Sequence, residues 1–291
     1  MLAGLRRVHL ILLLGQVCFA SLPVVGRMAL LGHLPAAGIV LVRMCGGAIV
    51  FAAIARSRGT LTFRRADLPF AIFCAFLGVA ANQELFIHGL ARSTATNASV
   101  LGATIPVFTA LTAIVLGREP ARVRRLAGIA VAVGGAIALV GVENLSLDSD
   151  HVVGSAMVLA NSLCYGTYLV IVRPLAERYD PIALLALLFA VGVPMVAPLG
   201  IAAWASAPPL TAGDIATLGF LVLVPTVGAY TLIQTALKTA EASLVAVYVN
   251  LQPIFAALGA YLLLGEEPTL RLAVCGAIVL VGVWLAAKPR P

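Results

Sequence analysis

Long apolar runs alternate with short polar interruptions along the whole chain. The runs fall near residues 8–30, 34–56, 68–90, 95–117, 124–142, 152–174, 181–205, 214–236, 240–264 and 270–288. Each run is close to the roughly 20 residues that an α-helix needs to cross a hydrocarbon core about 30 Å thick. The pattern predicts an all-α integral membrane protein with ten transmembrane helices. The first run is too long for the apolar part of a signal peptide, so we interpret it as the first span.

The composition agrees with a membrane location. Hydrophobic residues make up 62% of the chain and charged residues 11%, whereas soluble domains carry about 25% charge. The net charge of +7 comes mainly from Arg residues in short loops, where cytoplasmic loops of membrane proteins collect them, so we expect no nucleic-acid partner. The five cysteines lie in apolar runs without a CxxC motif, so we expect no metal and no cofactor.

The chain repeats itself at an offset of 146 to 148 residues. The polar stretch ENLSLDSDH at 143–151 divides it near the middle. We therefore expect two similar halves, residues 1–142 with spans one to five and residues 152–291 with spans six to ten. The matched positions are Cys18 with Cys164, Arg27 with Arg173, Pro35 with Pro181, Asp67 with Asp214, Pro106 with Pro253, Gly128 with Gly276, and Gly134 with Gly282.

Loop charge predicts that the two halves are inverted relative to each other. Five spans per half is an odd number, so the second half would enter the bilayer from the opposite side. With the N-terminus in the cytoplasm, 15 Lys and Arg residues fall inside and three outside, as the positive-inside rule requires. Loop 56–67 holds four Arg, and its repeat equivalent holds none. We expect a multi-pass protein of the bacterial inner membrane with both termini in the cytoplasm.

Two stretches resemble a known family. NQELFIHGLARSTATNASVLGATIPVFTALTAIVLGREP and YTLIQTALKTAEASLVAVYVNLQPIFAALGAYLLLGEEP are similar to the two EamA domains of drug/metabolite transporter superfamily proteins. The second copy has one more residue between its proline and the final motif. The resemblance implies a ten-helix fold with a substrate cavity between the halves. It also implies export of amino acids, other metabolites or toxic compounds, by proton-coupled exchange or facilitated diffusion.

Polar residues inside the predicted spans are candidates for the cavity wall because such residues are costly in a bilayer. Glu84 and His88 are four residues apart, so they share a helix face. Both are candidate proton carriers. Arg43 lies at a similar depth in the second span, which allows an Arg43–Glu84 ion pair. The alternatives are an ion pair with a purely structural role and a His88 that is only solvated. Gln83 is a further candidate for substrate binding.

Other polar side chains recur at helical spacing. They suit a cavity that holds a zwitterion or an amphipathic molecule. The alternative is hydrogen bonding between helices, worth about 1 kcal/mol each in membrane bundles. The groups are Asn161 with Tyr165 and Tyr168, Tyr230 with Gln234, and Tyr248 with Gln252; weaker candidates are Asn97, Asn250 and Gln16.

Pro106 and Pro253 occupy equivalent places inside spans four and nine. Each removes a helix hydrogen bond, which predicts a kink that serves either as a hinge or broken-helix site or as a fixed packing feature. Glycine- and alanine-rich faces on spans five and ten favour close helix packing. The family resemblance places these spans outside the cavity, where a homodimer contact is an alternative. We interpret Glu119 and Glu266, which sit at short polar turns followed by a proline, as caps of the next helix rather than as catalytic acids.

The motifs of other membrane-protein classes are missing from the sequence. It contains no HExxH, no Asp-rich prenyltransferase motif and no P-loop, so we expect neither an enzyme nor an ATP-driven pump. We expect a secondary transporter that exports amino acids or similar small metabolites by alternating access, with proton coupling as one mode. The alternatives are uptake or exchange of another substrate class, and a membrane protein that transports nothing. The expected partners are a small-molecule substrate and the lipid bilayer.

Overall fold

The computed structural model describes residues 2–118, 120, 123–140, 150–238, 245, 248–267 and 269–287. Every regular element within these ranges is helical. Several sequence predictions fall outside them. These concern the cap at Glu119, residues 143–149 of the mid-chain stretch, residues 240–244 of the ninth predicted span and the C-terminal residues 288–291. We call the residues before and after the mid-chain stretch the first and second halves.

The first half contains five of the predicted runs. α1 (Leu2–Leu31) and α2 (Ala36–Ser57) each form one continuous helix. The third run consists of η1 (Arg65–Asp67), α3 (Leu68–Ala75), the π-helical turn η2 (Phe76–Ala80) and α4 (Ala81–Ala91). The fourth is divided into α5 (Ala95–Gly102) and α6 (Ile105–Val115), and the fifth is α7 (Val123–Val140).

The second half follows the same order with one addition. α8 (Asp150–Ile171) is followed by a short helix that the sequence did not predict, α9 (Arg173–Arg178), and then by α10 (Pro181–Ala205). The next run is α11 (Ala212–Val222), the π-helical turn η4 (Leu223–Gly228) and α12 (Ala229–Leu237). The last two are η5 (Val249–Leu251) with α14 (Gln252–Leu264), and α15 (Leu270–Ala287).

These helices confirm an all-α membrane protein. Among the described residues, seven helical segments are long and apolar enough to cross a membrane. Three shorter apolar helices, Leu126–Gly135, Gln252–Leu264 and Leu270–Gly282, lie at the fifth, ninth and tenth predicted runs. The exterior is apolar as well, since Val123, Leu270 and Val115 are 85%, 80% and 75% exposed. In a membrane-embedded bundle, exposed apolar side chains of this kind contact the lipid chains.

Two predicted continuous helices, 68–90 and 214–236, are interrupted by the π-helical turns. The turns begin at Phe76 and Leu223, an offset of 147 residues, so they occupy repeat-equivalent positions. Gly78 in η2 has the ring of Tyr168 against it, and a Cβ there would lie 2.2 Å from that ring. η4 contains Pro225, which has no backbone N–H to donate. Turns of this kind are frequent at functional sites.

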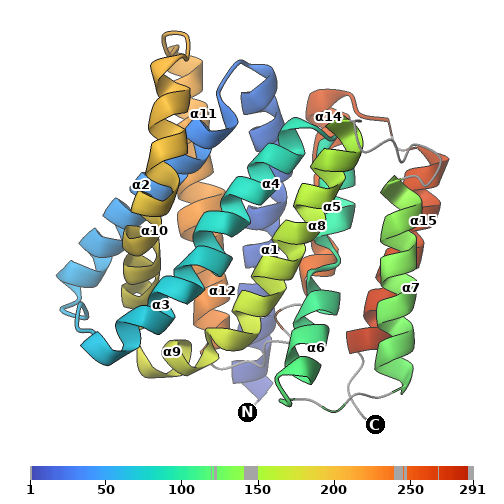
Figure 1. The fold of residues 1–291 in the computed structure, drawn as a ribbon, viewed down its shortest axis with the longest axis horizontal. Helices are drawn as coiled ribbons and strands as arrows, with labels where there is room; N and C mark the ends of the chain where they lie inside the picture. Colours follow the sequence, from blue (N-terminus) through green and yellow to red (C-terminus); the bar gives the residue numbers. More distant parts are fainter. Residues whose placement is uncertain are drawn as a thin grey trace.

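Figure 1 shows the helices running between two ends of a bundle. We call the end where α1 begins the N-terminal end; α3 begins there and α9 lies there. The other end, where α11 begins and α14 finishes, is the opposite end. α7 and α15 pack closely against each other at one edge of this view, and a Cβ on Gly282 would come within 2.3 Å of the Ala132 backbone. The predicted packing role of these glycine-rich faces is confirmed, and a homodimer stays a prediction.

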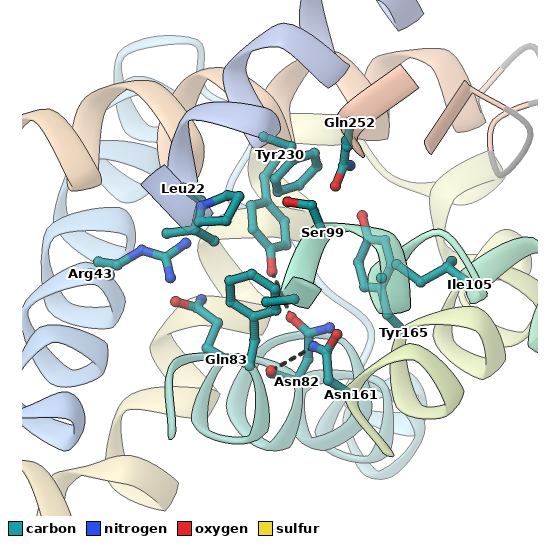
Figure 2. A pocket seen from close by; sticks show the side chains of 15 residues that line it. Leu22, Arg43, Asn82, Gln83, Ser99, Ile105, Asn161, Tyr165, Tyr230 and Gln252 are labelled. Atoms are coloured by element: carbon teal, nitrogen blue, oxygen red, sulfur yellow. Dashed lines mark hydrogen bonds between the residues drawn. The ribbon is translucent and has the colours of Figure 1, made fainter. Parts of the chain in front are cut away.

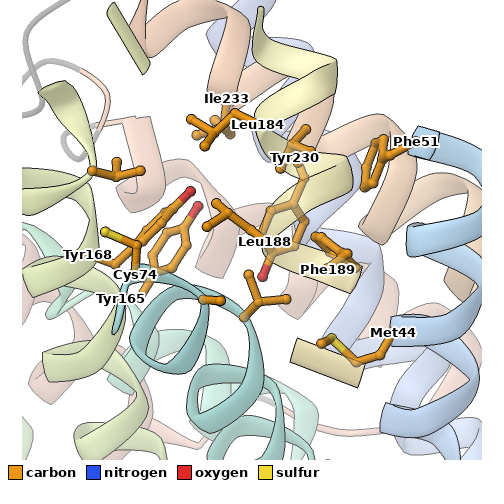
Figure 3. Packing of buried hydrophobic residues seen from close by; sticks show 14 of the residues in the cluster. Met44, Phe51, Cys74, Tyr165, Tyr168, Leu184, Leu188, Phe189, Tyr230 and Ile233 are labelled. Atoms are coloured by element: carbon orange, nitrogen blue, oxygen red, sulfur yellow. The ribbon is translucent and has the colours of Figure 1, made fainter. Parts of the chain in front are cut away.

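An aromatic cluster forms the core beside the centre of the bundle. Tyr230 meets Phe189 edge to face, with ring centroids 5.2 Å apart, and Phe189 meets Phe51 in the same way at 5.1 Å. Tyr165 and Tyr168 are stacked at 5.7 Å. Figure 3 shows these rings surrounded by Leu184, Leu188 and Ile233. The core therefore holds rigid rings where the two halves meet, because Phe51 belongs to the first half and the others to the second.

Candidate functional site

A buried cavity of about 60 Å³ lies between the two halves (Figure 2). Helices α1, α2, α4, α5 and α6 of the first half and α8, α12 and α14 of the second contribute to its wall. The wall is mainly apolar, with a few polar groups directed inward. Its residues are Phe19, Leu22, Pro23, Arg43, Asn82, Gln83, Phe86, Ala98, Ser99, Gly102, Ile105, Asn161, Tyr165, Tyr230 and Gln252.

Six of the ten residues that the sequence singled out line this cavity. They come from five different helices, so the fold brings together side chains that lie up to 209 positions apart in the sequence. The six are Arg43, Gln83, Asn161, Tyr165, Tyr230 and Gln252. The other four, Glu84, His88, Gln234 and Tyr248, are not part of the wall.

Arg43 is held in the wall by one hydrogen bond. Its side chain is only 1% exposed, and its Nε donates to Thr226 Oγ1 at 2.9 Å. Nη1 is buried without a hydrogen-bond partner. Among the described residues no carboxylate lies within 4.0 Å of the guanidinium. The predicted Arg43–Glu84 ion pair is therefore not formed: the two residues share a depth, but Glu84 points toward His88.

Glu84 and His88 form a contact outside the cavity. His88 Nε2 lies 3.1 Å from Glu84 Oε2, and the side chains are 30% and 16% exposed, in that order. This confirms that the two share a helix face. Neither oxygen of Glu84 has a hydrogen-bond donor among the described residues.

Gln83 and Ser99 present further unpaired atoms to the cavity. Gln83 Nε2 contacts Met44 Sδ at 3.4 Å, while its Oε1 has no partner. Ser99 Oγ is also buried without a partner. The sequence analysis did not single out Ser99 or Asn82. The one available signal was their position, Asn82 directly before Gln83 and Ser99 within two turns of Pro106.

Asn161 and Tyr230 connect the halves through hydrogen bonds. Asn161 Nδ2 donates to the Asn82 carbonyl at 2.8 Å, a bond drawn in Figure 2. The Tyr230 hydroxyl donates to the Gly78 carbonyl and lies at the same distance, 3.3 Å, from Asn82 Oδ1. For these two residues the alternative role, hydrogen bonding between helices, is present in the structure. Both also face the cavity.

The remaining candidates have different surroundings. Gln252 Nε2 donates to Gln16 Oε1 at 2.6 Å, which ties α14 to α1 beside the cavity. Gln234 is buried beside Tyr168. Tyr248 hydrogen-bonds to His9 on α1, away from the cavity. Asn97 donates to Ser93 and Ser155, and only the backbone of Asn250 is described.

The helix break at Ala103–Thr104 lies beside the cavity, whose wall includes Gly102 and Ile105. Pro106 stands in the first turn of α6, where its missing N–H is tolerated. Because residue 106 has no N–H, the Gly102 carbonyl loses its helical donor. The neighbouring Leu101 carbonyl accepts from Ser162 Oγ and Thr104 Oγ1 instead. Pro253 has the same place in the first turn of α14, which directly follows the 3₁₀ helix η5. That either proline acts as a hinge stays a prediction.

At the N-terminal end of the bundle the halves are bridged by Asp67. Arg178 Nη1 lies 2.6 Å from both of its carboxylate oxygens, and the Tyr179 hydroxyl donates to one of them. The Arg64 backbone N–H donates to the same hydroxyl at 3.2 Å. These hydrogen bonds to Asp67 raise the pKa of the Arg178 guanidinium. Asp214, the repeat equivalent of Asp67, instead forms a capping box with Thr211.

At the opposite end the halves are bridged by Glu266. Its carboxylate accepts from the backbone N–H groups of Ala95 and Thr96 at 2.9 and 3.1 Å, and from Thr96 Oγ1 at 2.8 Å. The prediction that Glu266 caps the following helix is wrong, because it caps α5 of the other half. Thr269 Oγ1 accepts from Leu272 N–H and caps α15. Both ends of the bundle are thus bridged across the halves.

The fold and the cavity define the class: a multi-pass all-α membrane protein with a mainly apolar cavity between two halves, into which a few polar groups are directed. Residues 6–141 and 152–288 both match the EamA-like transporter family, and the chain belongs to that family. It is a membrane transporter and not an enzyme. Among the described residues there is no cluster of three or more His, Cys, Asp or Glu that could hold a metal ion.

Three similarities illustrate the relationship. The chain is 32% identical over 218 residues to an uncharacterized transporter of Archaeoglobus fulgidus, covering 74% of this chain and 75% of the relative. It is 30% identical over 283 residues to a probable terminal-alkyne amino-acid exporter of Streptantibioticus cattleyicolor, covering 94% and 91%. A chain in a solved crystal structure shares the fold with a TM-score of 0.69 at 17% identity, covering 97% of this chain and 96% of that one.

Proposed function

We propose that this protein is a secondary transporter that exports amino acids or similar small metabolites by alternating access. The observation that carries the proposal is the cavity with walls from both halves, a few polar groups directed into it, and a bridge between the halves at each end. A site at the interface of two repeats is the arrangement that serves transport when one repeat rocks against the other.

In this proposal ten spans form two inverted repeats, residues 1–142 and 152–291. The equal offset of the two π-helical turns supports the repeat. The three shorter apolar helices support the full count of ten spans. The excess of Lys and Arg at the N-terminal end supports a cytoplasmic location for that end and for both termini. The membrane in question is the bacterial inner membrane.

The two bridges act as gates in this mechanism. Opening toward the cytoplasm requires Asp67 to separate from Arg178 and Tyr179, while the Glu266 bridge at the other end stays closed. Opening toward the outside requires Glu266 to leave the N-terminus of α5, while the Asp67 bridge stays closed. Neither bridge is deeply buried, so each is weak enough to break and reform during a transport cycle.

Two observations support an amino-acid-sized substrate. One buried water needs about 10–15 Å³ of cavity volume, so a cavity of about 60 Å³ has room for roughly four to six waters. A small amino acid contains about as many heavy atoms. The similarity to the amino-acid exporter of Streptantibioticus cattleyicolor extends over nearly the whole chain. Its name concerns that protein, and it supports the same substrate class here.

Proton coupling through Glu84 and His88 is the second part of the proposal. Both lie on α4 next to Gln83, which lines the cavity. A proton taken up by either member of this pair raises the charge of the pair by one. This change in charge acts on the cavity wall through Gln83, which directly precedes Glu84 on α4.

Reconstitution in liposomes tests the proposal. The full chain is incorporated, and fluxes of a panel of amino acids are measured in both directions, with and without a pH gradient. The proposal predicts saturable flux that a pH gradient accelerates. Glu84→Gln should lose the pH effect, whereas Glu177→Gln, at an exposed carboxylate paired with Arg173, should retain it. Gradient-independent flux in the wild type would make Glu84 structural, and the absence of any vectorial movement would contradict transport.

A further inference from the structure

The least satisfied group in the cavity is the guanidinium of Arg43. Its Nη1 is buried without a partner, and no carboxylate of the described residues neutralises its charge. A cation removed from water without an anion is costly, and leaving one uncompensated strongly destabilises a protein. The guanidinium fork matches the two oxygens of a carboxylate. An anionic group bound in the cavity would compensate this charge.

We infer that Arg43 binds the carboxylate of the substrate and that Ser99, Gly102 and Gln83 accept hydrogen bonds from its ammonium group. The substrate class is then a zwitterionic α-amino acid. This inference rests on the proposed function and adds the groups that recognise the substrate. Recognition of a zwitterion requires one cationic hydrogen-bond donor and several hydrogen-bond acceptors in a single cavity.

Arg43 is fixed in a position that suits this role. Nε donates to Thr226 Oγ1, and Thr226 Oγ1 donates in turn to the Leu221 carbonyl at 2.8 Å within the same helical run. These two bonds hold the guanidinium while Nη1 remains without a partner. Figure 2 shows the side chain of Arg43 entering the cavity from α2, on the same side of the view as Gln83. The carboxylate would meet a donor that is already oriented.

Two of the acceptors are side-chain oxygens without a partner among the described residues, and the third is a backbone carbonyl of the cavity wall. Ser99 Oγ and Gln83 Oε1 are both buried without a partner and both line the cavity. The Gly102 carbonyl has lost its helical donor because residue 106 is proline. An ammonium group has three N–H bonds to donate. Phe19, Leu22 and Tyr165 complete the wall with apolar surface for a side chain.

Ligand-induced thermal stabilisation of the purified full-length protein in detergent tests the inference. The probes are the common amino acids, their α-amides and the corresponding acids that lack the amino group. A ligand that binds the native state raises the unfolding temperature, and at equal concentration a tighter ligand raises it further. The amino acids that bind should bind roughly 10- to 150-fold more tightly than their amides, the range expected for a charge-assisted hydrogen bond. The deaminated acids should also bind more weakly.

Variants separate recognition from structure. Arg43→Met should abolish the tighter binding of the amino acids relative to their α-amides. Thr226→Val removes the partner of Nε but leaves Nη1, so the preference should persist. Ser99→Ala should weaken the binding of the amino acids and leave the binding of the deaminated acids unchanged. If Arg43→Met does not fold, the binding of amino acids and α-amides to the wild type and to Thr226→Val still tests whether the cavity recognises a carboxylate.

Each outcome counts for or against the inference. Equal binding of acids and amides, or no binding by any carboxylate in the panel, overturns it. Saturable liposome flux of compounds that lack a carboxylate would overturn it and leave the transport function standing. Carboxylate binding that depends on Arg43, without flux of any probe in either direction, would support the role of Arg43 and contradict transport.

Discussion

The hydroxyl of Tyr230 on α12 donates a hydrogen bond to the carbonyl of Gly78, which lies in the π-helical turn of the other half, at 3.3 Å. The reverse connection is made by Arg43 of the first half, whose Nε donates to Thr226 in the π-helical turn of the second. Each irregular turn is thus bonded to a cavity residue of the opposite repeat. A movement of one half against the other must stretch or break both bonds.

Removing the hydroxyl of Tyr230 tests this connection. Tyr230→Phe keeps the ring contacts with Phe19 and Phe189 but deletes the hydrogen bonds to Gly78 and Asn82. We expect a loss of about 0.5–1.5 kcal/mol in stability, the usual value for one hydrogen bond. Thermal unfolding in detergent measures it. Tyr261→Phe, at an exposed tyrosine, is the control and should unfold as the wild type does.

Gly78 should not tolerate a larger side chain. A Cβ there would lie 2.2 Å from the Tyr168 ring, so Gly78→Ala forces a buried aromatic residue to move. We expect a loss of about 1–3 kcal/mol, as for other overpacked cores. Gly219→Ala in α11 is the matched control, since nothing lies within 4 Å of its added Cβ. That variant should be neutral or slightly stabilising. Equal stability of the two variants would argue against the tight contact.

The Asp67 bridge should restrain the N-terminal end. In a cysteine-free chain that carries Ser99→Cys, Asp67→Asn should raise the rate of thiol labelling from that end. The increase should be at most about fivefold, because exposed ion pairs are weak. Adding Arg178→Gln should bring little further change, since the pair is already broken. Asp214→Asn, the repeat equivalent, weakens only a helix cap and should leave labelling unchanged. Equal effects of the two Asn variants would contradict a bridge specific to Asp67.

Glu266 should stabilise the opposite end through α5. Glu266→Ala removes the acceptor for two backbone N–H groups and the Thr96 hydroxyl. Loss of an N-terminal cap costs about 0.5–2 kcal/mol. The neighbouring Glu267 is exposed, so Glu267→Ala controls for the change in loop charge. Thermal unfolding of both variants measures the effect. An unfolding temperature for Glu266→Ala equal to that of the control would show that the cap contributes nothing.

The hydrophobic pattern predicted the helical runs well, because a bilayer requires about 20 apolar residues whatever the details of packing. It could not predict the π-helical turns. One extra residue in a single turn hardly alters the apolar pattern, and the ring that packs against η2 at Gly78 belongs to Tyr168, 90 positions away in the sequence. Likewise α9 is too short and polar to produce a signal in hydropathy.

For the site, the sequence identified polar residues but not their directions. Counting residues gave Arg43 and Glu84 similar depths, yet depth says nothing about the direction in which a side chain leaves its helix. Glu84 meets His88, while Arg43 reaches Thr226. Ser99 was overlooked because serine is common in membrane helices, and its unpaired hydroxyl becomes significant only beside the cavity. The cap at Glu266 was assigned to the wrong helix because its partner comes from the other half.

The central claim is that the cavity between the halves opens to each side of the membrane in turn. Accessibility of a cysteine at Ser99, in a chain with the five native cysteines replaced, tests it most directly. Membrane-impermeant thiol reagents are applied to one side of oriented vesicles and then, in a separate sample, to the other. The account predicts labelling from both sides, slowed by a bound amino acid. Labelling from one side alone would contradict it.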